Sequence, residues 1–296
     1  MRILLVVNLK SGQGDAGVYE YVRALVERGA EVTVRDLHRS SDIDGALRDA
    51  AEHDRVVAAG GDGTVSAICY TLANSGIPVL AYPAGTANVF ALNMRMPADP
   101  EELAHITLNG QLKDIDLGEF TYGQTEEHRQ GFIVAAGAGF DAAIMEAADR
   151  LKPTLGAAAY FVGALQNLTP TVSRFTLHID GKTVHSEGIA VLVMNVARLQ
   201  FDLALTHRSD PADGLFEVVI VRTKNVPGLI PTVWGAFLDR FVTNPEHTAG
   251  LEVHSAQEVL IEAEPNLSLQ YDGEVLPATT PLRARVLPGA TRLILP

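Results

Sequence analysis

The sequence has little cysteine and no long apolar run. Its single cysteine, Cys69, excludes a disulfide within the chain and fits a reducing compartment. The apolar run at residues 3–7 is too short for the core of a secretory signal peptide. No apolar stretch reaches the roughly 18–20 residues that a membrane-spanning helix needs. We therefore expect a cytoplasmic protein without a transmembrane segment.

Basic residues are scarce relative to acidic ones. The 296 residues include 23 Lys and Arg against 36 Asp and Glu, which gives a formal net charge of −13. Binding to nucleic acid needs a concentrated basic surface, so we expect no nucleic-acid partner. Hydrophobic residues make up 47% of the chain, which is enough for the core of one large domain or two ordinary ones.

Several catalytic motifs are absent from the sequence. There is no GxxxxGK[ST] P-loop. There is no GxSxG nucleophile elbow, and the nine histidines show no zinc-ligand spacing such as HxxxH. These absences exclude a P-loop enzyme, and they give no support to a serine hydrolase or a zinc enzyme.

The first 95 residues alternate between short apolar runs and amphipathic stretches. The predicted strands are residues 3–7, 31–34, 55–59 and 78–82. A loop and a helical pattern follow each strand. The first helix is expected to bury Val18, Val22, Leu25 and Val26, and a later helix is expected over 64–73. Four such units predict an open, Rossmann-like parallel sheet with helices on both faces.

The pattern changes near Gly110 and becomes rich in strands. The predicted strands are residues 132–136, 175–179, 189–194, 216–221, 259–263 and 267–271, and helices are predicted at 155–168 and 228–241. We predict an α/β domain over 1–118 and an antiparallel, β-sandwich-like domain over 119–287. Whether residues 288–296 return to the first domain stays open.

Three polar, glycine-rich loops follow the first, third and fourth predicted strands, at one edge of the sheet. The nucleotide-binding candidates in them are Asn8, Ser11, Gly12, Gly60, Gly61, Asp62, Gly63, Thr64, Gly85, Thr86 and Asn88. Glycine lets the backbone approach a phosphate, and a helix starting at Thr64 would direct its free N–H groups toward that phosphate. Asp62 suits such a loop if Mg²⁺ lies between its carboxylate and the phosphate. The alternative for this loop alone is a tight turn with an Asx hydrogen bond.

These loops resemble the diacylglycerol kinase catalytic domain of the bacterial soluble lipid kinases, a family that includes relatives of sphingosine and ceramide kinases. The resemblance continues through Ile115-Asp116-Leu117-Gly118, the segment 136–142, Asp213-Gly214-Leu215 and Asp272-Gly273-Glu274. It therefore covers nearly the whole chain and implies an NAD kinase/diacylglycerol kinase-like fold, in which domain 1–118 would bind the nucleotide and domain 119–287 would be the lipid-acceptor domain. The GGDGT segment alone is less specific, because NAD kinases share it.

The resemblance also implies the chemistry. ATP would be the phosphoryl donor, and Asp272, with Glu274 beside it, would take the proton of a lipid hydroxyl while Asp62 anchors the metal ion. Asp116 is expected to support this network indirectly. Diacylglycerol would give phosphatidic acid, and the protein would visit the inner membrane surface transiently from the cytoplasm. For Asp272 and the residue after it, a type I′ hairpin turn is an equally compatible interpretation.

The resemblance also implies a Mg²⁺ site in the loop at the Asp213-Gly214-Leu215 motif. Its ligands would be Asp210, Asp213 and the carbonyl of Leu215, all hard oxygen ligands that suit Mg²⁺. The alternative is a β-turn around Pro211.

The sequence departs from the family pattern at two places. The loop after the fourth strand usually continues Asn-Asp-Phe-Ala-Arg, but here Val89 and Leu92 replace the acid and the Arg. The segment 195–202 lacks a glycine pair that is often present. Two alternatives therefore stay open: an NAD kinase-like small-molecule kinase, and a non-catalytic nucleotide or lipid sensor. The acceptor lipid, the nucleotide and the choice between monomer and homodimer are open as well.

Overall fold

The computed structural model describes residues 1–8, 16–37, 42–123, 128–139, 170–196, 198–199, 203–204, 210–222 and 250–296. The predicted helices at 155–168 and 228–241 lie outside these residues, as do Ser11 and Gly12. The chain divides into two compact units. Unit 1 is Met1–Leu117, Gly131–Ile133 and Leu287–Pro296, and unit 2 is Gly118–Gln130 and Val134–Val286. Within the described part of the chain, no helix is long and apolar enough to cross a membrane.

Unit 1 is built on a parallel sheet, as predicted. Its strands are β1 (Arg2–Val7), β2 (Glu31–Asp36), β3 (Arg55–Gly60) and β4 (Pro78–Pro83), in the order β2-β1-β3-β4. The last strand, β18 (Leu282–Leu295), pairs in parallel with β4 through Arg292 and Leu293. The chain therefore returns to the first sheet, which answers a question that the sequence left open.

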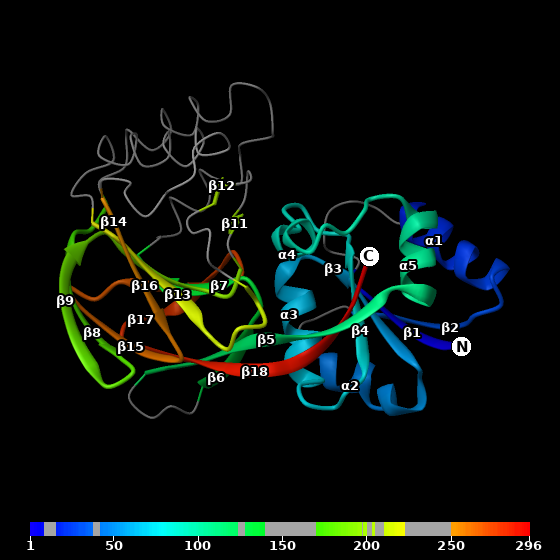
Figure 1. Ribbon diagram of the computed structural model, residues 1–296, viewed down its shortest axis with the longest axis horizontal. Helices are drawn as coiled ribbons and strands as arrows, with labels where there is room; N and C mark the ends of the chain where they lie inside the picture. The colour runs from blue at the N-terminus through cyan, green and yellow to red at the C-terminus, as the bar shows by residue number, and fades with distance from the viewer. Residues whose placement is uncertain are drawn as a thin grey trace, which may run out of the picture. The chain divides into compact units, whose positions relative to one another are not determined.

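Five helices accompany this sheet: α1 (Ala16–Glu27), α2 (Ile43–Leu47), α3 (Asp62–Thr71), α4 (Val89–Asn93) and α5 (Pro100–Asn109). Helices α1 and α5 lie side by side in Figure 1 and pack on one face of the sheet. Tyr21 and Leu25 of α1 share a core there with Leu103 of α5 and Leu5 of β1. The α1 prediction was wrong at Val26, which is 53% exposed, because the buried stripe runs through Tyr21 instead.

Two other helix predictions need correction. Helix α3 begins at Asp62, two residues before the predicted start at Thr64. The helical spacing of Ile43, Ala46, Leu47 and Ala50 predicts one continuous helix, but α2 ends at Leu47 and a separate 3₁₀ turn, Ala50–Glu52, follows it.

Unit 2 contains an antiparallel six-stranded sheet in the order β14-β13-β10-β7-β16-β17. Its strands are β7 (Ala135–Ala138), β10 (Ala190–Met194), β13 (Phe216–Val221), β14 (Leu251–Ala256), β16 (Ser268–Tyr271) and β17 (Glu274–Thr279). A two-stranded ribbon is formed by β11 (Arg198–Leu199) and β12 (Leu203–Ala204). The prediction of an antiparallel, strand-rich second half is confirmed.

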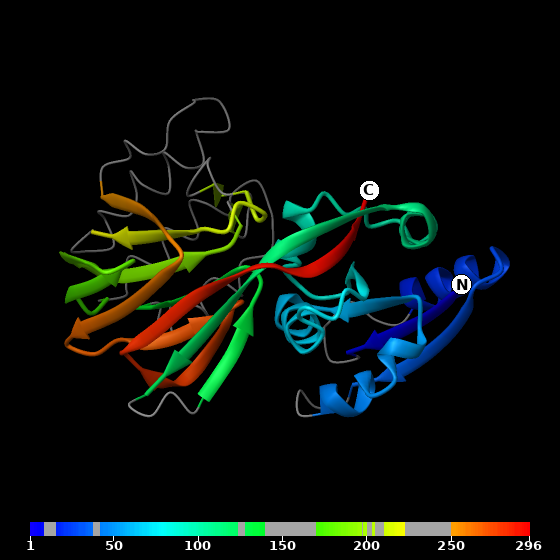
Figure 2. The same cartoon turned by 60° about the horizontal axis from the view of Figure 1, so that its bottom comes forward.

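The other strands of unit 2 are β6 (His128–Phe132), β8 (Ser173–Ile179), β9 (Lys182–Gly188), β15 (Glu258–Glu264) and parts of β5 (Gln111–Tyr122) and β18. Strand β15 pairs antiparallel with β8 and with the first half of β18, and β8 pairs with β9. Figure 2 shows β18 as one long strand. Both β5 and β18 contribute residues to each unit.

The strand predictions succeed in part. Five of the six strands predicted in the second half are present, but 132–136 is not one strand, because β6 ends at Phe132 and β7 begins at Ala135. Strands β5, β9, β14 and β17 and most of β18 were missed.

Candidate functional site

Three glycine-rich segments follow β1, β3 and β4, and these parallel strands end at one edge of the sheet. Asn8, directly after β1, connects that strand to the second segment, the loop at 60–64. Its main-chain N–H donates to the Ala59 carbonyl at 2.8 Å, and its Nδ2 donates to Thr64 Oγ1 at 2.8 Å. The structure therefore brings Asn8 and Thr64 together, as predicted for one nucleotide-binding edge.

Glycine is required where the second and third loops touch. A Cβ at Gly85 would lie 2.4 Å from Gly61 Cα and 2.9 Å from Asn88 Oδ1. A Cβ at Gly60 would lie 2.6 Å from Thr64 Cβ. The backbones of the two loops therefore approach each other more closely than any side chain would allow.

Replacing Gly85 by Ala should separate these two loops. We expect a loss of about 1–3 kcal/mol in the free energy of unfolding, since the neighbouring backbone cannot yield as a flexible side chain would. The affinity for ATP should fall with it. Urea unfolding and titration calorimetry with ATP measure the two effects. The control is Gly45→Ala in α2, where an added Cβ meets nothing within 4 Å. Equal behaviour of the two variants would contradict the close approach.

Asn88 closes the third loop on itself. Its Oδ1 accepts from the Gly85 N–H at 2.8 Å, and its Nδ2 donates to the Gly85 carbonyl at 2.7 Å. Its backbone is left-handed, with φ of 49°, which asparagine tolerates better than most residues. Thr86, between the two, is exposed at the tip of the loop. The side chain of Asn88 thus fixes the loop, and its assignment to the nucleotide stays a prediction.

Asp62 connects the second loop to the fourth helix. Its Oδ1 accepts from the Phe90 N–H at 2.8 Å and its Oδ2 from the Val89 N–H at 3.0 Å. These are the first two N–H groups of α4, so Asp62 caps that helix from another part of the chain. Burial raises the pKa of the Asp62 carboxyl, and the two N–H donors oppose this shift.

The earlier start of α3 changes which N–H groups face the loop. The Thr64 N–H, which the sequence offered to phosphate, donates instead to the Gly61 carbonyl at 3.0 Å. The Val65 N–H donates to the same carbonyl at 3.1 Å. The first N–H groups of the helix are therefore those of Asp62 and Gly63, within the GGDG segment itself.

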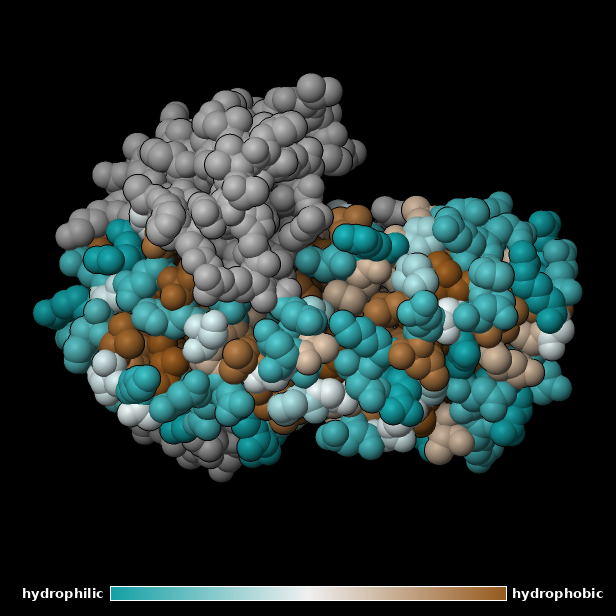
Figure 3. Space-filling view, in the orientation of Figure 1, coloured by the Kyte–Doolittle hydropathy of each residue, from teal (hydrophilic) through white to brown (hydrophobic). Residues whose placement is uncertain are grey.

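Val89 and Leu92, the two residues after β4 that depart from the family pattern, lie in different surroundings. The Val89 side chain is 8% exposed, and its N–H holds Asp62. Leu92 is 64% exposed and belongs to the few exposed large apolar side chains among the described residues. In the face shown in Figure 3, hydrophilic residues predominate and apolar ones are scattered. The valine is thus part of the packing of α4, and the leucine is not.

In unit 2, Asp272 and Gly273 form the tip of the hairpin between β16 and β17. Their φ values are 43° and 86°, and Tyr271 pairs with Glu274. The predicted type I′ turn is thus confirmed. Asp272 Oδ1 accepts from the N–H groups of Val134 at 2.8 Å and Ala135 at 3.1 Å. The Asp272 N–H donates to the Ala135 carbonyl at 2.8 Å, so the turn is fixed to the chain just before β7.

The predicted metal ligands lie in a turn. Asp210 Oδ1 accepts from the Ala212 N–H at 3.1 Å, and Asp213 Oδ1 accepts from the Leu215 N–H at 2.9 Å. Both carboxylates are exposed. Among the described residues, no group of three His, Cys, Asp or Glu could hold a metal ion. The predicted set contains two carboxylates and one carbonyl, and this all-oxygen chemistry fits Mg²⁺. The turn interpretation and the metal interpretation are compatible.

Asp116 is buried, with 2% of its surface exposed. Its Oδ1 accepts from the Gly289 N–H at 2.8 Å, and Gly289 has a left-handed φ of 59°. This bond holds β5 to an irregular point of β18 in unit 1. A role of Asp116 near the reacting groups stays a prediction.

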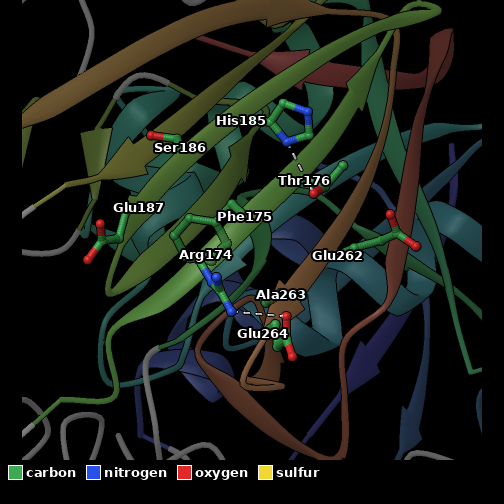
Figure 4. A pocket seen from close by; sticks show the side chains of 9 residues that line it. All are labelled: Arg174, Phe175, Thr176, His185, Ser186, Glu187, Glu262, Ala263 and Glu264. Atoms are coloured by element: carbon green, nitrogen blue, oxygen red, sulfur yellow. Dashed lines mark hydrogen bonds and ion pairs between the residues drawn. The ribbon is translucent and has the colours of Figure 1, made fainter.

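A depression of about 620 Å³ lies on strands β8, β9 and β15 (Figure 4). Two pairs of its side chains are hydrogen-bonded to each other: Arg174 lies 3.3 Å from Glu264, and His185 lies 3.4 Å from Thr176. None of the predicted site residues lines it. Cavity volume therefore does not lead to the candidate site in this molecule.

Several contacts that shape the site could not be predicted from the sequence. The N–H groups of Val134 and Ala135 hold Asp272, and those of Val89 and Phe90 hold Asp62. These donors are main-chain N–H groups, so the amino-acid type at these positions does not predict them. Tyr271, next to Asp272 in the sequence, was also missed.

Comparison with known proteins agrees with this arrangement. The family model of the diacylglycerol kinase catalytic domain matches residues 2–120, and the model of the YegS C-terminal NAD kinase beta sandwich-like domain matches residues 134–295. A probable lipid kinase YegS-like of Pseudomonas fluorescens is 30% identical, over 96% of this chain and 93% of the relative. A diacylglycerol kinase of Mycobacterium tuberculosis is 26% identical, over 100% of this chain and 95% of the relative.

A solved structure gives the same fold. The crystal structure of a putative diacylglycerol kinase from Bacillus anthracis superposes with a TM-score of 0.79 at 20% identity, over 100% of this chain and 95% of that one. The two matched domains, one in each half of the chain, define a lipid kinase class. The chain belongs to the diacylglycerol kinase and YegS-like lipid kinase family. The resemblance seen in the sequence is confirmed.

Proposed function

We propose that this protein transfers the γ-phosphoryl group of ATP to the primary hydroxyl of diacylglycerol, giving phosphatidic acid and ADP. The observation that carries the proposal is the linked set of loops at the edge of the unit 1 sheet. Asn8, Thr64 and Asp62 tie these segments together, Asn88 closes the third loop on itself, and Gly85 allows the second and third loops to touch. Such a backbone surface suits a polyphosphate better than a neutral ligand.

Asp272 is the residue that we propose to remove the proton from the acceptor hydroxyl. A lipid hydroxyl is a weak nucleophile, so its proton must leave as its oxygen bonds to the γ-phosphorus. Asp272 takes this proton while the bond between the γ-phosphorus and the ADP oxygen breaks. The turn fixes one carboxylate oxygen through Val134 and Ala135, which holds the base in one orientation. Glu274 flanks the turn on the next strand.

Asp210, Asp213 and the Leu215 carbonyl are the residues proposed to hold Mg²⁺. When bound, the ion would supply positive charge that offsets the negative charge of the phosphoryl oxygens. For a lipid acceptor, we propose that the protein works in the cytoplasm and visits the inner membrane surface transiently.

The test is a direct phosphorylation assay. The purified chain, radiolabelled ATP and Mg²⁺ are incubated with diacylglycerol in mixed micelles, and in parallel with ceramide, a sphingoid base and NAD. We expect labelled phosphatidic acid as the main product. Labelled NADP with no labelled lipid would favour the NAD kinase alternative. ATP binding in calorimetry without turnover on any acceptor would favour the sensor alternative, and either result would overturn the proposal.

A further inference from the structure

Beside the Asp272 turn, three side chains of unit 2 form a short hydrogen-bonded chain. Gln130 Nε2 donates to the Tyr271 hydroxyl oxygen at 2.6 Å, and the Tyr271 O–H donates to Glu274 Oε2 at 3.4 Å. Gln130 comes from β6, while Tyr271 and Glu274 face each other across the hairpin. The hydrogen bonds therefore run in one direction: the Gln130 amide donates to the phenol, and the phenol donates to the Glu274 carboxylate.

The surroundings of Tyr271 favour this direction. Its ring lies 5.4 Å from the Phe120 ring, which limits how far the phenol can move. Burial, and then the negative charges of Glu274 and Asp272, raise the pKa of the Tyr271 phenol. The phenol thus remains a neutral O–H donor throughout the neutral pH range. Since Gln130 already donates to the phenol oxygen, the O–H is turned toward Glu274.

Glu274 needs such a partner because it is exposed at the start of β17. A long carboxylate side chain in solvent samples several rotamers, and ordering it costs conformational entropy. A hydrogen bond from Tyr271, whose ring is packed against Phe120, reduces the number of rotamers that Glu274 samples.

We propose that Tyr271, oriented by Gln130, is a positioning residue that holds Glu274 and the Asp272 turn in the geometry used for phosphoryl transfer. This inference rests on the proposed function. It adds two residues, from β6 and β16, to the machinery around Asp272. Neither residue was among the site candidates from the sequence.

The experiment compares Tyr271→Phe and Gln130→Glu with the wild-type full chain. Tyr271→Phe removes the O–H and keeps the ring. Gln130→Glu offers the phenol an acceptor in place of a donor, so the O–H turns away from Glu274. Tyr122→Phe is the matched control, because Tyr122 stacks with the same Phe120 ring, at 5.9 Å.

Two readouts are measured: the kcat and KM for ATP in the diacylglycerol assay, and hydrogen–deuterium exchange of the hairpin amides over residues 268–279. We expect both test variants to lose kcat roughly three- to tenfold, the loss expected for one hydrogen bond of ordinary strength, with unchanged KM for ATP. Exchange in the hairpin should become several-fold faster in the same two variants. Tyr122→Phe should match the wild type in both readouts.

Wild-type kcat and exchange in Tyr271→Phe would overturn the inference. So would a rise in KM for ATP with unchanged kcat, since that would place the effect on nucleotide binding. If the wild type phosphorylated no lipid, the proposed function would fail and the catalytic part of the inference with it. Exchange alone would then decide whether the hydrogen-bonded chain holds the hairpin.

Discussion

Replacing Asp272 by Asn should lower kcat for lipid phosphorylation by about one hundred- to ten thousandfold, the usual contribution of a general base. The fold should survive, because Asn retains an Oδ1 that accepts from Val134 and Ala135. Asn also tolerates the φ of 43° at this turn. The variant therefore removes the capacity to take a proton and little else. Steady-state kcat and KM for ATP measure the loss of the base, and the melting temperature measures whether the fold is retained.

The chain offers a close control for this experiment. Asp180 lies in a second Asp-Gly turn of unit 2, with φ of 46° followed by 80° at Gly181. Its Oδ1 also accepts from two main-chain N–H groups, those of Gln257 and Glu258. Asp180→Asn should keep wild-type kcat. If Asp272→Asn kept it too, the assignment of Asp272 as the base would be wrong; if both variants lost it, the loss would reflect turn structure.

Sequence pattern predicted unit 1 well because its central strands are buried on both faces. Strands β1, β3 and β4 are almost entirely buried along their lengths. A strand buried on both faces appears in the sequence as a continuous apolar run, so it can be predicted without deciding which of its faces is buried. The parallel order then placed the three loops at one edge. The general location of the candidate site was therefore predictable.

The missed strands share a different physical character. Strand β9 has one large apolar residue, Val184, and every residue except Gly188 is exposed or partly exposed, so it has no apolar run to detect. Strand β17 contains Pro277, and β18 contains Pro288 and Gly289, residues that usually interrupt a strand. These strands exist because neighbouring strands supply their hydrogen bonds, and that context is not local in sequence.

The finer geometry of the site was also beyond the sequence. Helix α4 has only five residues, too few for a periodic pattern to appear. Without α4, the sequence could not show that Asp62 caps a helix 27 residues further along the chain. The sequence therefore suggested a metal anchor for Asp62, while the structure shows a carboxylate that binds two main-chain N–H groups.

This contrast leads to a second strong expectation, for Asp62→Asn. The asparagine has one acceptor oxygen, so one of the N–H groups of Val89 and Phe90 would face its NH₂ group. A buried donor left without an acceptor costs about 1–3 kcal/mol, and we expect that loss in the free energy of unfolding. KM for ATP should rise, because α4 and the Gly85–Asn88 loop lose their attachment to the GGDG loop.

Asp99→Asn is the matched control in the same unit. Asp99 caps its own helix, α5, by accepting from the Glu102 N–H, and Asn caps helices about as well as Asp. Its stability and KM for ATP should stay at the wild-type values. If Asp62→Asn kept its stability and KM for ATP but lost kcat, Asp62 would act on the reacting groups and not on the loops. The dependence of kcat on Mg²⁺ would then separate metal anchoring from the capping role, since only an anchor would shift it.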